Sequence, residues 1–166
     1  MFVDLMHRRT ILAAEKSVYD EVLTAGITSI IARHSGHFQD HSEVVYAAYL
    51  QHLGRLLGDD AEPAASMDGR VTMSILATLY PVSEATGSAI VSARERFDGS
   101  GAPYGCGPEG IPMSARCLGL ARFIVDSLEA PFQSHSDLAL VVNTQAEFVA
   151  AWYDENFAST HVCKTV

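Results

Sequence analysis

The amino-acid sequence predicts an all-α fold, and three observations support that prediction. Apolar side chains recur at intervals of three and four residues through most of the chain, as they do along one face of a helix. No segment alternates apolar and polar residues in the pattern of a half-buried strand. The length of 166 residues fits one domain and suffices to enclose a hydrophobic core. We therefore expect a single compact domain of about six to seven helices.

The first half of the chain contains three segments with helical spacing. From residue 5 to residue 31 the apolar pattern predicts one or two amphipathic helices, with Gly26 as the candidate kink or break. Ser42 suits the N-cap of the next helix, which is expected to run to about residue 57. Residues 58–67 contain a proline and two aspartates and are expected to form a loop. A shorter helix is predicted over residues 71–79, and Pro81 ends it.

The second half is predicted to contain three further helices, over residues 83–97, 112–128 and 144–157. Pro112 suits the first turn of the middle one, which carries the apolar residues Leu118, Leu120, Ala121, Phe123, Ile124 and Leu128. Residues 98–111 hold five of the twelve glycines and two prolines, so an irregular surface loop is expected there. In this loop Asp98 and Ser100 are each followed by glycine, which is typical of consecutive turns.

Composition narrows the class of protein. The 20 Asp+Glu against 11 Lys+Arg give a formal net charge of −9 without any basic run, so no nucleic-acid or membrane surface is expected. No stretch approaches the ~20 apolar residues of a membrane span. The first residues lack the apolar segment of a signal peptide, which predicts a cytoplasmic protein. The three cysteines form no CxxC pair and are expected to be plain thiols, with Cys117 on an apolar helix face.

The seven histidines are an unusual count, because imidazole is the most common metal ligand. His34, His37 and His41 lie in or beside one predicted connection, but Gly36 interrupts their spacing, and a solvated loop is the favoured interpretation. His52 is interpreted as a core or boundary histidine. No phosphate-binding glycine motif, HExxH or GxSxG occurs. Residue chemistry alone therefore indicates no more than a helical domain with a glycine-rich loop.

The segment from residue 95 to residue 120, ERFDGSGAPYGCGPEGIPMSARCLGL, carries a more specific signal. It resembles the signature of HD-GYP domains, which are all-α bacterial phosphodiesterases that hydrolyse cyclic di-GMP with bound metal ions. Ala102 replaces the tyrosine of the family's name. The resemblance extends over residues 17–153, with the signature loop at residues 98–112. The residues that match the signature are Glu95, Asp98, Gly99, Ser100, Gly101, Pro103, Gly105, Gly110, Ile111, Pro112, Ala115 and Arg116.

The resemblance also implies where the active site of the family would lie in this chain. The aligned positions are Tyr19, Gln51, His52, Arg55, Asp68, Ala93, Arg94 and Arg122. Only His52 and Asp68 are good ligand types, because alanine offers no ligand and arginine stays protonated. The resemblance therefore implies a catalytically inactive domain that has lost the iron or manganese of the family and holds no cofactor.

Three of these positions hold arginine, namely Arg55, Arg94 and Arg122, and the resemblance places them around one cavity. One hypothesis is that they pair with Asp68 and Glu95 in a buried ionic plug. The other is that they bind a phosphate-bearing ligand, such as cyclic di-GMP, without metal. The plug is favoured at this level because buried charges need partners first.

The function predicted from these observations is that of a non-catalytic signalling or protein-interaction domain in bacterial cyclic di-GMP signalling. In the family the glycine-rich loop contacts partner signalling domains, including diguanylate cyclases. The expected interaction residues are therefore Glu95, Asp98, Gly99, Ser100, Gly101, Pro103 and Arg116, with simple bracing of the loop as the structural alternative. The domain would act on a separate protein or as a homodimer.

Two other functions compete with this interpretation. The first is a divergent metal-dependent phosphodiesterase that uses His52, Asp68 and the three histidines of the connection. The second is a metal-free phosphate or nucleotide sensor built on the three arginines.

Overall fold

Only helices, and no strands, are found among the elements of the described part of the chain. The computed structural model describes residues 2–51, 53, 68–79 and 81–127, with the backbone alone at residues 2–17 and 68. Within these residues the elements are α1 (Phe2–Ser35), α2 (Ser42–Leu50), α3 (Asp68–Leu79), α4 (Glu84–Ser92), the short 3-10 helix η2 (Pro108–Gly110) and α5 (Met113–Ser127). The predicted all-α class is confirmed. The number of six to seven helices stays a prediction, because the helix expected at 144–157 lies outside the described residues.

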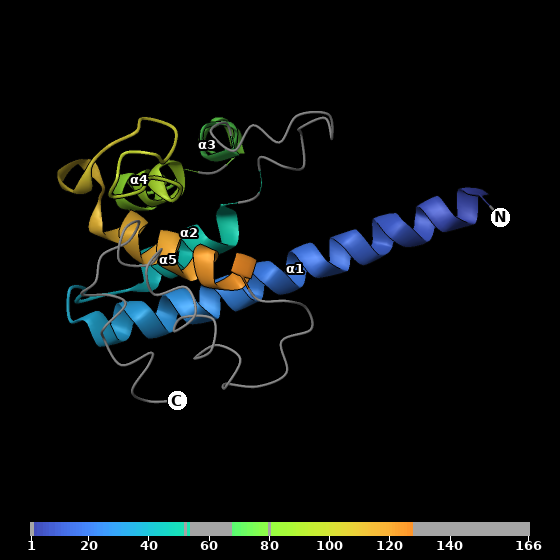
Figure 1. Ribbon diagram of the computed structural model, residues 1–166, viewed down its shortest axis with the longest axis horizontal. Helices are drawn as coiled ribbons and strands as arrows, with labels where there is room; N and C mark the ends of the chain where they lie inside the picture. Colours follow the sequence, from blue (N-terminus) through green and yellow to red (C-terminus); the bar gives the residue numbers. More distant parts are fainter. Residues whose placement is uncertain (1, 52, 54–67, 80, 128–166) are drawn as a thin grey trace.

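The helices form layers around the middle of the molecule. Figure 1 shows α2 and α5 between α1 on one side and α4 with α3 on the other, and the helix contacts follow the same order. The first half of α1 extends past the other helices (Figure 1). None of the described helices is long and apolar enough to cross a membrane.

Gly26 does not interrupt the first helix. α1 is a single helix of 34 residues that runs through Gly26 without a break. A Cβ atom at Gly26 would meet nothing within 4 Å, so no close packing requires glycine there. The helix ends at Ser35, and Gly36 follows with a φ of 69°. Glycine adopts this left-handed conformation readily, which explains why the helix stops at this point.

The helices α2 and α5 each start one residue away from the predicted position. Ser42 is the first residue of α2 and His41 takes the N-cap position, so the predicted cap at Ser42 is wrong. The backbone amide of Ser42 donates instead to Oδ1 of Asp40 at 2.8 Å, which is the main cause of a lowered pKa at Asp40. Pro112 precedes α5 rather than forming its first turn, and its carbonyl accepts from the amide of Arg116 at 3.0 Å.

The end of α4 is the largest departure from the predicted helix boundaries. Ser83 caps α4, since its hydroxyl accepts from the amide of Thr86 at 3.1 Å. The helix was expected to continue to residue 97 but ends at Ser92. The chain then turns at Ala93 and becomes extended, because Glu95 is used to hold the loop that follows. The helix α2 ends at Leu50, whereas it was expected to continue to about residue 57. Residues 54–57 of that predicted length lie outside the described residues.

One apolar core joins all five helices, and α5 lies at its centre. Buried residues surround α5 on every side, as expected for a helix that contacts neighbours all round. Of the predicted apolar residues of α5, Leu118, Leu120, Ala121 and Ile124 are buried and Phe123 is half-buried, whereas Leu128 lies outside the described residues. Cys117 is also buried, which agrees with its expected place on an apolar helix face. Burial raises the pKa of its thiol to about 12. Leu76 of α3 completes the cluster.

The shorter helix α3 attaches to the core through small residues and one hydrogen bond. A Cβ atom at Gly69 would lie 2.7 Å from the carbonyl oxygen of Ile90, so the backbones of α3 and α4 are in close contact there. The hydroxyl of Thr72 donates to the carbonyl of Gln51 at 3.1 Å, which connects α3 to the end of α2. These contacts fix α3 beside the loop described below.

Truncation of the central leucine tests this description of the core. Leu118→Ala removes a side chain with 0% exposure and should lower the free energy of unfolding by about 2–5 kcal/mol, because a cavity replaces packed atoms. The matched control is Leu79→Ala, at a side chain with 75% exposure, which should change the free energy of unfolding by less than about 0.5 kcal/mol. Urea unfolding followed by circular dichroism measures both values, and equal losses would contradict the assignment.

Candidate functional site

The glycine-rich loop begins with a closed turn at the end of α4. The amide of Ala102 donates to the carbonyl of Arg94 at 3.1 Å, which brings the two ends of the turn together. Inside it, the amide of Gly99 donates to the carbonyl of Arg96 at 2.9 Å, and Gly99 has a φ of 77°. Oδ1 of Asp98 accepts from the amide of Ser100 at 2.9 Å. The consecutive turns predicted at Asp98 and Gly99 are therefore present.

Gly101 lies so close to the start of the loop that no side chain fits. A Cβ atom at this position would be 2.3 Å from the amide nitrogen of Arg96 and 2.4 Å from Cα of Glu95. Both neighbours are backbone atoms and cannot move aside as a flexible side chain would. The loop therefore needs glycine at residue 101 in order to pack against its own first residues.

The carboxylate of Glu95 holds the second part of the loop. Glu95 is only 3% exposed, and its Oε1 accepts from the amide of Tyr104 at 2.6 Å while Oε2 accepts from the amide of Cys106 at 2.9 Å. Hydrogen bonds to an ionised acceptor are stronger than those between neutral groups, so this carboxylate is well suited to fix a loop without regular secondary structure. Both carboxylate oxygens of Glu95 therefore hold backbone amides of the loop.

Two arginines fasten the loop to the flanking helices. Arg116 of α5 donates from Nε to the carbonyl of Ile111 at 2.9 Å and from Nη2 to the carbonyl of Pro108, and its guanidinium lies over the ring of Phe97. Arg70 of α3 contacts the carbonyl of Pro103 and stacks on the Tyr104 ring at 5.2 Å.

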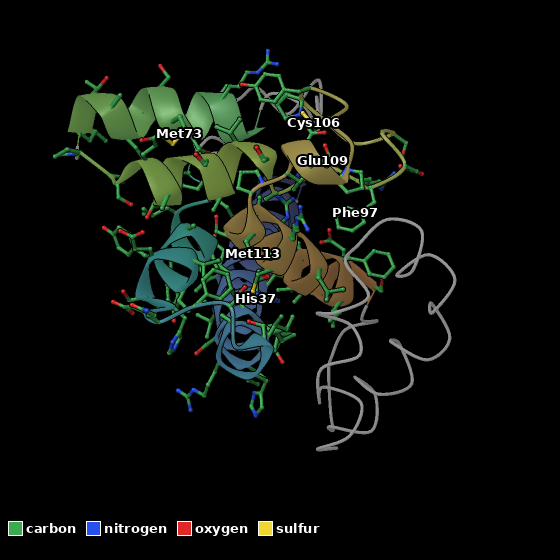
Figure 2. All side chains as sticks on the ribbon, turned by 90° about the vertical axis from the view of Figure 1, so that its left-hand side faces the viewer. His37, Met73, Phe97, Cys106, Glu109 and Met113 are labelled. Carbon is green, nitrogen blue, oxygen red and sulfur yellow. The ribbon has the colours of Figure 1, made fainter. Side chains whose placement is uncertain are left out.

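Figure 2 shows Phe97, Cys106 and Glu109 gathered at one side of the molecule, away from His37. Of the predicted interaction residues, Glu95 and Arg116 make contacts that brace the loop. The exposed surface of the loop stays available beside them.

A cleft of about 370 Å³ opens between the loop, the residues after α4 and the second half of α5. Its lining residues are Ala93, Arg94, Arg96, Ser100, Gly101, Ala102, Gly119, Arg122, Phe123, Asp126 and Ser127. Three positions that the sequence analysis singled out, Ala93, Arg94 and Arg122, therefore come together at one place. Arg122 is 8% exposed and lies deep in the cleft, whereas Arg94 is half-buried.

The sequence analysis missed Arg96, which lines the same cleft as Arg94. Residues two apart point in different directions on a helix but share a side in an extended chain. Because the helix was expected to continue to residue 97, the two arginines were not seen as a pair. The signal that could have found them is the dense cluster of glycines just after them, which favours an earlier end of the helix.

The remaining predicted active-site positions lie elsewhere or outside the description. Tyr19 is 48% exposed on α1, and Gln51 is 1% exposed, with its Nε2 donating to the carbonyl of Ala48 at 3.1 Å. Neither of them lines the cleft. Asp68 begins α3, and its side chain is not described; His52 and Arg55 lie outside the described residues.

The residues gathered in the cleft do not fit the pair of metal ions that the resemblance implies. Alanine has no donor atom, and a guanidinium is permanently charged, so Ala93, Arg94 and Arg122 supply no metal ligand. Among the residues that the structure describes, no group of three or more His, Cys, Asp or Glu side chains could hold a metal ion. His34, His37 and His41 lie at the end of α1 and in the connection after it, where Nδ1 of His34 is 2.9 Å from the carbonyl of Ile30.

Compared with known proteins, the chain matches no protein-family model, and no curated protein is significantly similar to it. Its function therefore has to be inferred from the geometry of the loop and the cleft. The loop offers a fixed surface, and the cleft offers arginine side chains in a concave setting.

Replacement of Gly101 tests whether the loop packs as tightly as described. Gly101→Ala should destabilise the protein by about 1–3 kcal/mol, because the new methyl group collides with the backbone of Glu95 and Arg96. Gly107→Ala is the matched control, since a Cβ atom there would meet nothing within 4 Å and the φ of −74° suits alanine. Thermal unfolding compares the two variants, and an unchanged Gly101→Ala protein would contradict the close contact.

Replacement of Glu95 tests the carboxylate that holds the loop. In Glu95→Gln one carboxylate oxygen becomes an amide group, which cannot accept from a backbone amide, and the protein should lose about 1–3 kcal/mol of stability. Hydrogen exchange at the amides of Tyr104 and Cys106 should accelerate in the same variant. Glu109→Gln, at an exposed residue of the same loop, is the control and should leave both measurements unchanged. Slow exchange at both amides in Glu95→Gln would show that other groups hold the loop.

Proposed function

We propose that this chain is a non-catalytic HD-GYP-like domain that acts by binding another protein in cyclic di-GMP signalling. The observation that carries the proposal is the loop at residues 98–112, which is fixed from three directions and exposed at its surface. Glu95, Arg116 and Arg70 hold its backbone from the end of α4, from α5 and from α3. A loop without regular secondary structure that is held this firmly is suited to present one fixed shape.

A fixed loop loses little conformational freedom when a partner binds, so more of the contact energy contributes to affinity. The exposed side of the loop carries Tyr104, which is 62% exposed, together with Pro108 and Glu109. Tyrosine gives a large contact area with few rotatable bonds, which is why it is frequent at protein interfaces. The resemblance to HD-GYP domains favours a diguanylate cyclase or another signalling domain as the partner.

The lack of catalysis is supported by the residue types in the cleft. Hydrolysis of a phosphodiester by metal ions requires imidazole and carboxylate ligands that hold the ions and generate hydroxide. At three aligned positions this chain places Ala93, Arg94 and Arg122 around one cleft instead. These residues support binding rather than metal-dependent hydrolysis.

An exchange of the exposed tyrosine tests the binding surface. Tyr104→Ala should weaken capture of a purified diguanylate cyclase by about tenfold or more, as truncation of a central interface aromatic commonly does. The matched control is Tyr46→Ala, because Tyr46 is 45% exposed on α2 and lies outside the loop. Surface plasmon resonance with the immobilised chain measures both. Equal binding by the Tyr104→Ala variant and the unchanged protein would overturn the loop as the interaction surface.

An activity assay separates this proposal from a divergent phosphodiesterase. The purified chain, supplied with iron or manganese, should not hydrolyse cyclic di-GMP or bis-p-nitrophenyl phosphate. Metal analysis of the protein as purified accompanies this assay. Stoichiometric metal together with metal-dependent hydrolysis would replace the proposal by the phosphodiesterase that uses His52 and Asp68.

A further inference from the structure

The cleft beside the loop concentrates positive charge in an acidic protein. Three arginines and a single aspartate line it, whereas the chain as a whole has a formal net charge of −9. Concave surfaces lined by one sign of charge attract ligands of the opposite sign. The local excess of cations therefore indicates an anionic ligand.

The three arginines reach the cleft from two parts of the fold. Arg94 and Arg96 lie on the segment after α4, and Arg122 comes from α5. Arg122 is 8% exposed, and all three arginines also take part in interactions within the chain. Their positions are therefore fixed by the fold, which lowers the entropy that a ligand must remove when it binds.

We infer that this cleft binds a small molecule with a phosphate monoester group, without any metal ion. The guanidinium group donates two parallel hydrogen bonds to phosphate oxygens, and donors from two walls can contact a phosphate from both sides. The hydroxyls of Ser100 and Ser127 line the same cleft and add neutral donors. This inference does not depend on the protein-binding proposal, although Ser100, Gly101 and Ala102 of the loop line the cleft.

The rest of the cleft indicates the size and nature of the group attached to the phosphate. Its volume of about 370 Å³ lies within the range of small-molecule sites, so the cleft accommodates more than a phosphate alone. Phe123 offers an aromatic ring, and Asp126 offers an acceptor for an amino or hydroxyl group. A ring with polar substituents, as in a mononucleotide, matches these features.

Isothermal titration of the full chain with inorganic phosphate, AMP and adenosine tests the inference. AMP should bind with a Kd below about 1 mM, inorganic phosphate more weakly, and adenosine not measurably, since the phosphate makes the charged contacts. Raised salt should weaken the binding of AMP, because ions screen the arginines. No heat from AMP or phosphate up to about 10 mM would overturn the inference, and so would equal binding of adenosine and AMP.

Two matched variants locate the site. Arg96→Gln removes one cation from the cleft and should weaken AMP binding by about tenfold, as expected for loss of a charge-assisted hydrogen bond. Arg33→Gln makes the same charge change at an exposed residue of α1 outside the cleft and should leave affinity within about twofold. Equal weakening by both variants would show unspecific attraction and overturn the site.

Stabilisation of the unchanged protein gives an independent readout. Its melting temperature should rise with AMP concentration and stay constant with adenosine, because a ligand that binds only the folded state stabilises it. This measurement uses the unchanged protein, so it tests the inference even if the Arg96→Gln variant does not fold. A constant melting temperature with AMP would contradict it. That result would not count against the proposal that the loop binds a protein, since Tyr104 lies outside the lining of the cleft.

Discussion

The buried carboxylate of Glu95 connects the helical core to the irregular loop that carries both proposals. It accepts from the amides of Tyr104 and Cys106 at 2.6 and 2.9 Å, so a segment without helix or strand hydrogen bonds still has a fixed path. Gly101 makes this path sterically feasible, because any Cβ atom there would overlap the backbone of Glu95. The ends of the loop are then fastened to α5 by Arg116 and to α3 by Arg70.

The same constraint also forms the cleft. The Glu95 side chain points toward the loop amides, whereas the residues on either side of it point into the cleft. Arg94 and Arg96 therefore line the cleft together, facing Arg122 on α5. The loop and the cleft thus share part of one segment, because Ser100 and Gly101 of the loop line the cleft.

Much of the fold followed from the sequence, and parts of the site did too. The three- and four-residue spacing identified the five described helices and the buried residues of α5, since amphipathic periodicity reports burial directly. The glycine cluster identified the loop. The ends of helices were less accurate: α4 stops at Ser92, and the hydrogen bond between Glu95 and the amide of Tyr104, nine residues on, is not visible in local propensity.

The sequence by itself determined the all-α class and the place of the loop. These are local properties of composition and spacing. Only the tertiary structure decided that Arg96 joins Arg94 and Arg122 and that Glu95 serves the loop backbone. Tyr19 and Gln51 lie apart from that cleft, on the outside of α1 and at the end of α2. The physical reason is that side-chain direction depends on where a helix ends, and a long-range hydrogen bond sets that end.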